Sequence, residues 1–208
     1  DPSVLNATDV YVGSDEMTSG AFQGEFLAKF FKDQGKTDIS YLMLNGILGQ
    51  TSTTNRTASV LKALEDNGIK ATAAAAPLAA DYDRATAMDM ISPLLKTTKY
   101  DCIISNNDAM ALGAVEAMQQ QGLDPKSVPI VGIDATADGR QAIKDGTLAM
   151  TVFQNAEGQG RASLQAAANL IDGKPIAEGT GYEVDDENEF IIWVPFEPVT
   201  IDNVADYD

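Results

Sequence analysis

The sequence predicts an α/β protein built on a doubly wound parallel sheet with helices on both faces. Short apolar stretches rich in β-branched residues alternate with longer segments in which apolar residues recur at helical spacing. Several of the helical segments stop at a glycine, and polar residues follow the apolar stretches. Such an alternation of strand and helix is typical of a parallel sheet with right-handed connections.

The first half of the chain is expected to contain three strand and helix pairs. Ser14 and Asp15 can cap the first helix, whereas Gly35 and Gly68 end the first and second helices. The long polar segment NGILGQTSTTNR is expected to be a loop that precedes the second helix. The expected strands are 10–13, 39–44 and 69–75, and the third helix is expected at 84–96, where Pro93 limits its regularity.

Residues 100–134 form the unit around which the chain is expected to be organised. Residues 101–105 are apolar, as in a strand that is buried on both faces. Asn107 or Asp108 can cap the next helix, and a second buried strand at 129–133 ends at Asp134. The later elements are expected to be a helix at 136–144, a strand at 148–153, a helix at 158–171 and two short strands within 183–193 around the acidic turn DDENE, followed by an irregular tail at 194–208.

The composition excludes several classes of function. The chain contains no histidine, which excludes Ser-His-Asp triads and HExxH zinc sites. A formal net charge of −17, with scattered lysines and arginines, argues against nucleic acid as a partner. Because no run of about eighteen apolar residues occurs, no stable membrane insertion is expected. Cys102 lies in an apolar strand, where an inert buried thiol is expected.

Polar side chains follow the carboxyl ends of the predicted strands, which is where open α/β sheets bind their ligands. Amide, guanidinium and carboxylate groups can each bind adjacent hydroxyls with two hydrogen bonds, while an aromatic ring covers an apolar C–H face. Each such charged hydrogen bond contributes about 1.5 to 3 kcal/mol. This chemistry favours a sugar-binding site. The side chains concerned are Gln50, Ser52, Arg56, Tyr82, Asp83, Asn107, Asp134, Gln154 and Asn155.

Other interpretations compete for the same residues. A polar residue after a strand is often only a cap or a turn former. Arg56 could instead form a salt bridge with a surface carboxylate, and Tyr82 could simply pack over its loop. In an enzyme, Asp83, Asp108 and Asp134 could act as acid–base groups. We expect no catalytic residue, because these carboxylates are better suited to accepting hydrogen bonds from hydroxyls.

Five motifs distributed along nearly the whole chain carry a resemblance to a known family. They are VGSDE, LGQTSTTNRT, IISNNDAMALGAVEAM, VPIVGIDATADGRQAIKDGTLAMTVFQN and GRASLQAAANLIDGK. Together they resemble the second half of a periplasmic sugar-binding protein of the ribose and galactose/glucose type, in the type I periplasmic binding protein superfamily. In that family two α/β lobes joined by three crossing segments close on a sugar, and the complex docks on an ABC permease or a chemoreceptor.

The resemblance implies which residues contact the ligand. Hexose-binding relatives of the galactose type often have a histidine and an aspartate where Gln50 and Ser52 stand, and an indole where Tyr82 stands, which leaves open whether the sugar is a hexose or a pentose. The calcium loop of the galactose-binding branch is not reproduced at residues 33–38, so no metal and no cofactor are expected. The implied ligand contacts are Gln50, Ser52, Arg56, Tyr82, Asn107, Asp134 and Gln154.

The resemblance also implies a domain organisation. Residues 1–154 are expected to form the C-terminal α/β ligand-binding lobe, 155–183 a helix that returns to a first lobe, and 184–208 tail strands that rejoin the α/β lobe. Most of the first lobe would then be missing, so sugar binding is expected to be weak.

Two kinds of protein share this organisation. The first is a monomeric, non-enzymatic component of an ABC sugar importer, in the periplasm or as a cell-surface lipoprotein. The second is the effector-binding domain of a LacI-type transcription regulator. The stretch TLAMTVFQNAEGQGRAS favours the transport group.

Overall fold

The structure is a computed structural model that describes residues 5 and 9–207. It divides into two compact units, of which the first comprises residues 1–15 and 154–196 and the second comprises 16–153 and 197–208. The chain therefore passes between the units after residues 15, 153 and 196. Residues 184–196 fall in the first unit and 197–208 in the second. The predicted assignment of 1–154, 155–183 and 184–208 to a C-terminal lobe, a returning helix and tail strands stays a prediction.

The second unit is built on a five-stranded sheet whose pairings are all parallel. The central strands are buried on both faces because their side chains are mostly apolar, as in Cys102–Ser105. The strands, in sheet order, are β3 (Lys70–Ala73), β2 (Asp38–Asn45), β5 (Cys102–Ser105) and β6 (Ile130–Val131), with β4 (Leu78–Ala79) pairing β2 beyond the end of β3.

Two further strands extend this sheet beyond β6. Parallel bridges join Val131 to Met150 and Asp134 to Phe153, which places β7 (Thr151–Gln154) along the β6 side. β10 (Phe196–Val199) pairs with β7, and a 3-10 helix (Val204–Tyr207) ends the described chain. Another 3-10 helix (Pro125–Ser127) precedes β6.

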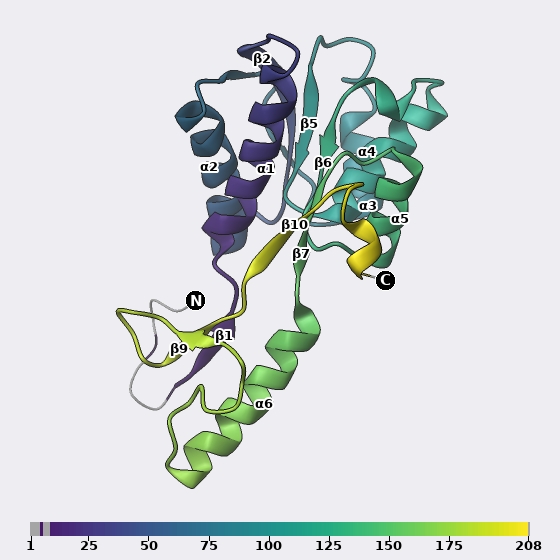
Figure 1. Ribbon diagram of the computed structural model, residues 1–208. Helices are drawn as coiled ribbons and strands as arrows, with labels where there is room; N and C mark the ends of the chain where they lie inside the picture. Colours follow the sequence, from purple (N-terminus) through teal and green to yellow (C-terminus); the bar gives the residue numbers. More distant parts are fainter. Residues whose placement is uncertain (1–4, 6–8, 208) are drawn as a thin grey trace. The chain divides into compact units, whose positions relative to one another are not determined.

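Helices cover both faces of the sheet, as Figure 1 shows. α1 (Glu16–Lys32) and α2 (Thr51–Asp66) pack together on one side, and α3 (Arg84–Ile91), α4 (Asp108–Gln120) and α5 (Ala137–Asp145) lie on the other. Each fully buried aliphatic side chain contributes about 1.5–3 kcal/mol; they include Leu27, Leu42, Ile103, Met110 and Ile130. The predicted α/β class with a parallel sheet is confirmed.

The first unit contains a small sheet and one long helix. β1 (Tyr11–Gly13) pairs in parallel with β9 (Ile191–Trp193), and β8 (Glu183–Val184) pairs with β9 in the antiparallel sense. The Asn155 side chain accepts a hydrogen bond from the amide of Gly158, which caps α6 (Ala156–Asp172). The two short strands predicted around DDENE are therefore confirmed.

Several predicted elements were wrong. The first strand lies in the small sheet instead of the main one, because its parallel partner is β9. The predicted loop NGILGQTSTTNR ends at Gln50, because α2 already begins at Thr51, and Thr53 and Arg56 lie on its buried face. The third helix stops at Ile91, shortly before Pro93. The tail at 194–208 contains β10 and a 3-10 helix instead of an irregular coil.

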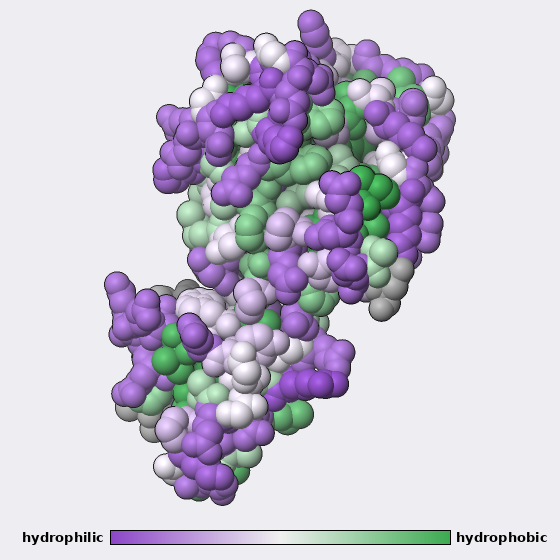
Figure 2. Space-filling model, viewed as in Figure 1, coloured by the Kyte–Doolittle hydropathy of each residue, from purple (hydrophilic) through white to green (hydrophobic). Residues whose placement is uncertain are grey.

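In the view of Figure 2, much of the surface of the second unit is hydrophilic. Figure 2 shows hydrophilic residues (purple) over the outer helices of the second unit and hydrophobic residues (green) between them. Among the described residues, no helix combines the length and hydropathy that a membrane span requires.

Candidate functional site

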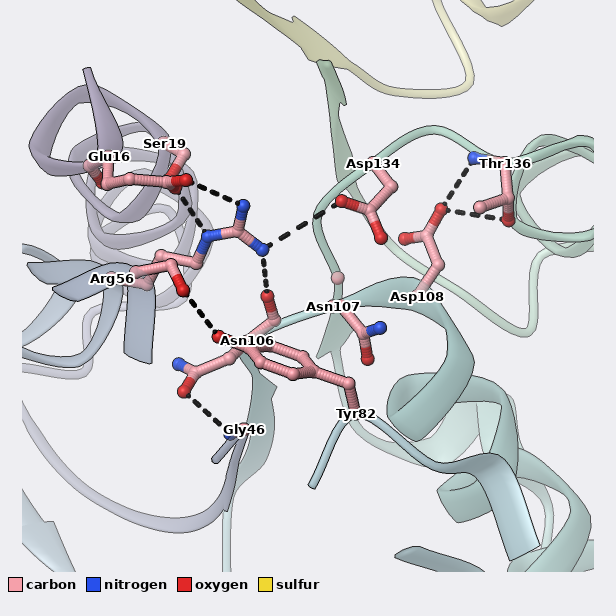
Figure 3. A network of polar contacts seen from close by, with 12 residues as sticks. Glu16, Ser19, Gly46, Arg56, Tyr82, Asn106, Asn107, Asp108, Asp134 and Thr136 are labelled. Atoms are coloured by element: carbon pink, nitrogen blue, oxygen red, sulfur yellow. Dashed lines mark hydrogen bonds and ion pairs between the residues drawn. The ribbon is translucent and has the colours of Figure 1, made fainter. Parts of the chain in front are cut away.

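The candidate site lies where the parallel strands of the second unit end. Because these strands point the same way, the residues that follow them share one edge of the sheet. Arg56 is reached from β2 through the first turns of α2, Tyr82 follows β4, Asn107 follows β5 and Asp134 follows β6. Figure 3 shows these four side chains close to one another, with Arg56 and Asp134 in direct contact.

Arg56 lies at the centre of this network and is only 5% exposed. Its Nε donates to Oε2 of Glu16 at 2.6 Å and its Nη2 to Oε1 of the same carboxylate at 3.2 Å. Its Nη1 donates to the backbone oxygen of Asn106 at 2.7 Å and lies 3.8 Å from Oδ1 of Asp134. These contacts fix both the plane and the direction of the guanidinium.

The Arg56 guanidinium remains charged in this buried position. Burial by itself lowers its pKa, but the hydrogen bonds and charge of Glu16, with smaller effects of Asp134 and Tyr82, raise the pKa above its ordinary value. The salt bridge considered from the sequence exists, but its partner is a carboxylate whose side chain is only 19% exposed.

Three consecutive polar residues after β5 have three different tasks. Asn106 joins neighbouring strand ends, because its Oδ1 accepts a hydrogen bond from the amide of Gly46 at 3.1 Å. Asn107 caps α4, because its Oδ1 accepts from the amide of Met110 at 3.0 Å. Among the described residues, none accepts a hydrogen bond from Nδ2 of Asn107, which leaves this group able to donate to a ligand.

Asp108, the third of these residues, is fully buried and ties the loop after β6 to α4. Its Oδ1 accepts from the hydroxyl of Thr151 at 2.6 Å, and its Oδ2 accepts from the amide and hydroxyl of Thr136 at 2.8 and 3.2 Å. A Cβ at Gly132 would lie 2.3 Å from Oδ1, so a side chain does not fit there. Burial raises the pKa of Asp108 to about 6, although these hydrogen bonds oppose the rise.

Asp134 presents a carboxylate beside Arg56, and its side chain is 27% exposed. Burial raises its pKa to about 7; Arg56 lowers the pKa, while the charges of Asp108 and Glu16 raise it further. Its backbone has a positive φ of 120°, and that of Ala135 is 51°. The other non-glycine residues with positive φ in the described chain are Asp81 and Tyr82, so backbone strain is concentrated in the two loops that carry Tyr82 and Asp134.

Tyr82 packs over its neighbouring loop, as considered from the sequence, and is also part of the site. Its hydroxyl shares hydrogen bonds with the hydroxyls of Ser52 at 2.9 Å and Thr53 at 2.8 Å. The ring lies against Gly46, where a Cβ would be 2.0 Å from the ring carbon Cζ. The residue is partly exposed, which leaves part of the side chain accessible to a ligand.

We expect Gly46→Ala to displace the Tyr82 ring, because the new methyl group would occupy the position of that ring. The variant should lose the hydrogen bonds of the Tyr82 hydroxyl and about 1–3 kcal/mol of unfolding free energy in urea denaturation. Gly160→Ala is the matched control, because a Cβ there meets nothing within 4 Å. Equal stability of Gly46→Ala and the unmodified chain would contradict this packing.

The remaining predicted residues are less closely tied to the network. Gln50 is exposed and precedes α2 without a side-chain hydrogen bond to the helix. Gln154 ends β7 and belongs to the first unit. Asp83 caps α3 by accepting a hydrogen bond from the amide of Thr86 at 2.7 Å. Within the described residues, no group of three or more Cys, Asp or Glu side chains is arranged to hold a metal ion.

Sequence reasoning missed Glu16 and the backbone carbonyl of Asn106 as partners of Arg56. An acidic residue in the first turn of a helix is common because it complements the helix dipole. That pattern gave no reason to pair Glu16 with a residue of the next helix. Only the packing of α1 on α2 brings the two side chains together.

Comparison with known proteins identifies the family. Residues 3–175 match the family model described as "Periplasmic binding protein domain". The chain is 36% identical over 209 residues to the D-galactose/methyl-galactoside binding periplasmic protein MglB of Haemophilus influenzae, covering 95% of this chain and 60% of that protein. It is 32% identical over 204 residues to a putative rhizopine-binding protein of Rhizobium meliloti, covering 98% of this chain and 61% of that protein.

A solved structure gives the same result. An ABC transporter solute binding protein from Bacillus halodurans with bound myo-inositol superimposes with a TM-score of 0.77 at 32% sequence identity, over 95% of this chain and 62% of that one. The chain thus spans about 60% of the length of the relatives it matches. The family model, these relatives and the fold agree, and the chain belongs to the periplasmic binding protein domain family.

Proposed function

We propose that the chain is the ligand-binding part of an extracytoplasmic solute-binding protein that delivers a monosaccharide, a hexose or a pentose, to an ABC importer. The observation that carries the proposal is the fixed guanidinium of Arg56 beside the carboxylate of Asp134, next to the amide of Asn107. The relatives named above support it, because one is a galactose-binding protein and another holds myo-inositol.

Each group in the site has a defined task toward a hydroxylated ligand. The Asp134 carboxylate accepts hydrogen bonds from hydroxyls, the Asn107 amide donates from Nδ2, and Arg56 donates from Nη1. The accessible part of the Tyr82 side chain covers an apolar C–H face of the sugar. Because these groups recognise hydroxyls without a nucleophile or a mobile base, the proposed activity is binding without turnover.

Neither an enzyme nor a transcription regulator is favoured by these observations. Two carboxylates considered as acid–base groups have structural roles, since Asp83 caps α3 and Asp108 ties the loop after β6 to α4. The relatives named above are a periplasmic protein, a putative ligand-binding protein and an ABC transporter component, which supports transport over a LacI-type regulator. The partner we propose is an ABC permease or a sensor, bound by a monomer of the complete protein.

Titration of the ¹⁵N-labelled chain with D-galactose, D-ribose and myo-inositol, followed by NMR, tests the proposal. We expect at least one of them to shift the side-chain amide signal of Asn107. An affinity on the order of 1 mM is expected because the proposed contacts come from one edge of one sheet. Asp134→Asn should weaken binding at least tenfold, which corresponds to about 1.4 kcal/mol.

Asp89→Asn is the matched control, because Asp89 is an exposed aspartate on α3. It should bind the sugar as the unmodified chain does. The proposal fails if no sugar shifts the Asn107 signal at high millimolar concentration. It also fails if Asp134→Asn and Asp89→Asn bind equally well.

A further inference from the structure

Glu16 holds Arg56 more closely than Asp134 does. Both of its carboxylate oxygens accept hydrogen bonds from the guanidinium, at 2.6 and 3.2 Å, whereas the nearest oxygen of Asp134 is 3.8 Å from Nη1. Figure 3 shows the guanidinium between these two carboxylates. The paired contact with Glu16 fixes the orientation of Arg56, and the contact with Asp134 does not.

The contact with Glu16 also determines which nitrogen of Arg56 faces the candidate site. Nε and Nη2 point to Glu16, and Nη1 points to the backbone oxygen of Asn106 and toward Asp134. Nη1 is therefore the nitrogen on the same side as the Asn107 amide and the Asp134 carboxylate (Figure 3). Without Glu16, rotation of the guanidinium would turn this donor away from the other site groups.

The charges near Arg56 leave no excess of positive charge. The Arg56 guanidinium lies between the carboxylates of Glu16 and Asp134, whereas the neighbouring Asp108 is opposed by a second cation, Arg140. In a buried setting such charges interact more strongly than they do in water. A neutral ligand is compatible with this balance, whereas a carboxylate or phosphate on the ligand would meet net repulsion.

We propose that Glu16 is a positioning residue that aims Nη1 of Arg56 at the ligand and cancels the guanidinium charge, so that the site selects uncharged sugars over anionic sugar acids. The inference rests on the proposed function, sugar binding at the same site. It adds a residue outside the predicted set of ligand contacts, and it names the class of ligand that the site rejects.

D-Galactose and D-galacturonate provide a matched pair of probes, because they differ by a carboxylate in place of the C6 hydroxymethyl group. In NMR titrations the unmodified chain should bind galactose at least about tenfold more tightly than galacturonate. Glu16→Gln should weaken galactose binding about threefold to tenfold and reduce the preference for galactose by about tenfold. Glu25→Gln, at an exposed position of the same helix, should change neither value.

Glu16→Asp separates charge from positioning. It keeps the carboxylate but shortens the side chain, so it should keep most of the preference for galactose and still weaken galactose binding. A general loss of folding would instead lower both affinities in both variants without restoring any preference. If Glu16→Gln binds galactose and galacturonate in the same ratio as the unmodified chain, the proposal is overturned.

A second measurement requires no sugar. The groups that face Asp134 are Arg56 on α2, Asp108 on α4 and Glu16 on α1. Removing the negative charge of Glu16 should lower the pKa of the Asp134 carboxyl in ¹³C NMR titration, because Glu16 helps to raise it and also neutralises Arg56. A role of Glu16 limited to packing would leave this pKa unchanged, and that result would contradict the proposal.

The two measurements separate the possible failures. If no sugar binds to the unmodified chain, the proposed function is wrong, and the selectivity assigned to Glu16 is wrong with it. If galactose binds but either the galactose preference or the pKa of Asp134 fails to respond to Glu16→Gln, the role of Glu16 alone is wrong.

Discussion

Arg56→Ala should lower the free energy of unfolding by about 3–5 kcal/mol and abolish measurable sugar binding. The substitution removes a nearly buried cation and leaves the carboxylates of Glu16 and Asp134 without their counterion. It also leaves the backbone oxygen of Asn106 without its donor. Urea denaturation followed by circular dichroism measures the loss of stability, and NMR titration measures the loss of binding.

A double replacement distinguishes the unpaired charges from the loss of packing. The variant with both Arg56→Met and Glu16→Gln removes the ion pair but keeps most of the volume, so it should be more stable than Arg56→Ala. Arg161→Ala is the control, because Arg161 forms an exposed ion pair with Glu157 within α6 and its loss should cost no more than about 0.5 kcal/mol. If Arg56→Ala is as stable as Arg161→Ala, the buried network does not stabilise the fold.

The fold could be predicted largely because local patterns determined the central elements. The apolar runs that form β2 and β5 are short and bounded by polar residues, as buried parallel strands are. Gly35 and Gly68 were predicted to end helices, and each follows its helix with a positive φ. In these places local conformation and tertiary packing favour the same structure.

Elements that depend on distant partners could not be predicted in this way. The start of α2 is rich in serine and threonine, which are poor helix formers, but its inner face is buried against α1. The strand pattern at β1 was recognised, but no local feature shows that its partner is β9 near the other end of the chain. β10 was missed because its two inward residues, Phe196 and Val199, are separated by Glu197 and Pro198.

In the candidate site too, features that depend on local sequence could be predicted, and features that depend on distant partners could not. The positions of Arg56 and Asp134 at strand ends predicted that they share one edge, and the structure places them 3.8 Å apart. The hydrogen bonds of Asp108 could not be predicted, because its partners are distant in sequence. Thr136 caps α5 and Thr151 begins β7. That Arg56, Asn107 and Asp134 bind a ligand stays a prediction, which the titrations above address.

Asp108→Ala should lower the unfolding free energy by about 3 kcal/mol at neutral pH. The substitution removes three accepted hydrogen bonds in a fully buried position and leaves the backbone amide of Thr136 without a partner. The two threonine hydroxyls can rotate about their C–O bonds, but the direction of the backbone amide is fixed. Asp138→Ala is the control, because Asp138 is exposed and its ion pair with Arg84 lies at the surface.

Asp108 also makes the stability of the fold depend on pH, because its carboxyl can titrate. Substitution by asparagine removes the titrating group but keeps the size of the side chain. The pKa of Asp108 is raised from 3.8 to about 6 in the folded chain, and that of Asp134 from 3.8 to about 7. Between about pH 4 and 7 the folded state therefore binds more protons than the unfolded chain, so stability decreases as the pH rises through this window. Carboxylates with lowered pKa values, such as Asp83 and Asp101, have the opposite effect and reduce stability below about pH 4.

The free protein should consequently be most stable near about pH 4 and lose stability as the pH rises toward about 7. Asp108→Asn should make this decline shallower in urea denaturation at a series of pH values. It should also lower the pKa of Asp134, because the charge of Asp108 is one cause of that raised value. A group whose pKa is the same in the folded and unfolded states contributes nothing to the pH dependence of stability. If the unfolding free energy of Asp108→Asn and of the unmodified chain falls equally steeply with pH, burial does not raise the pKa of Asp108, and the prediction is wrong.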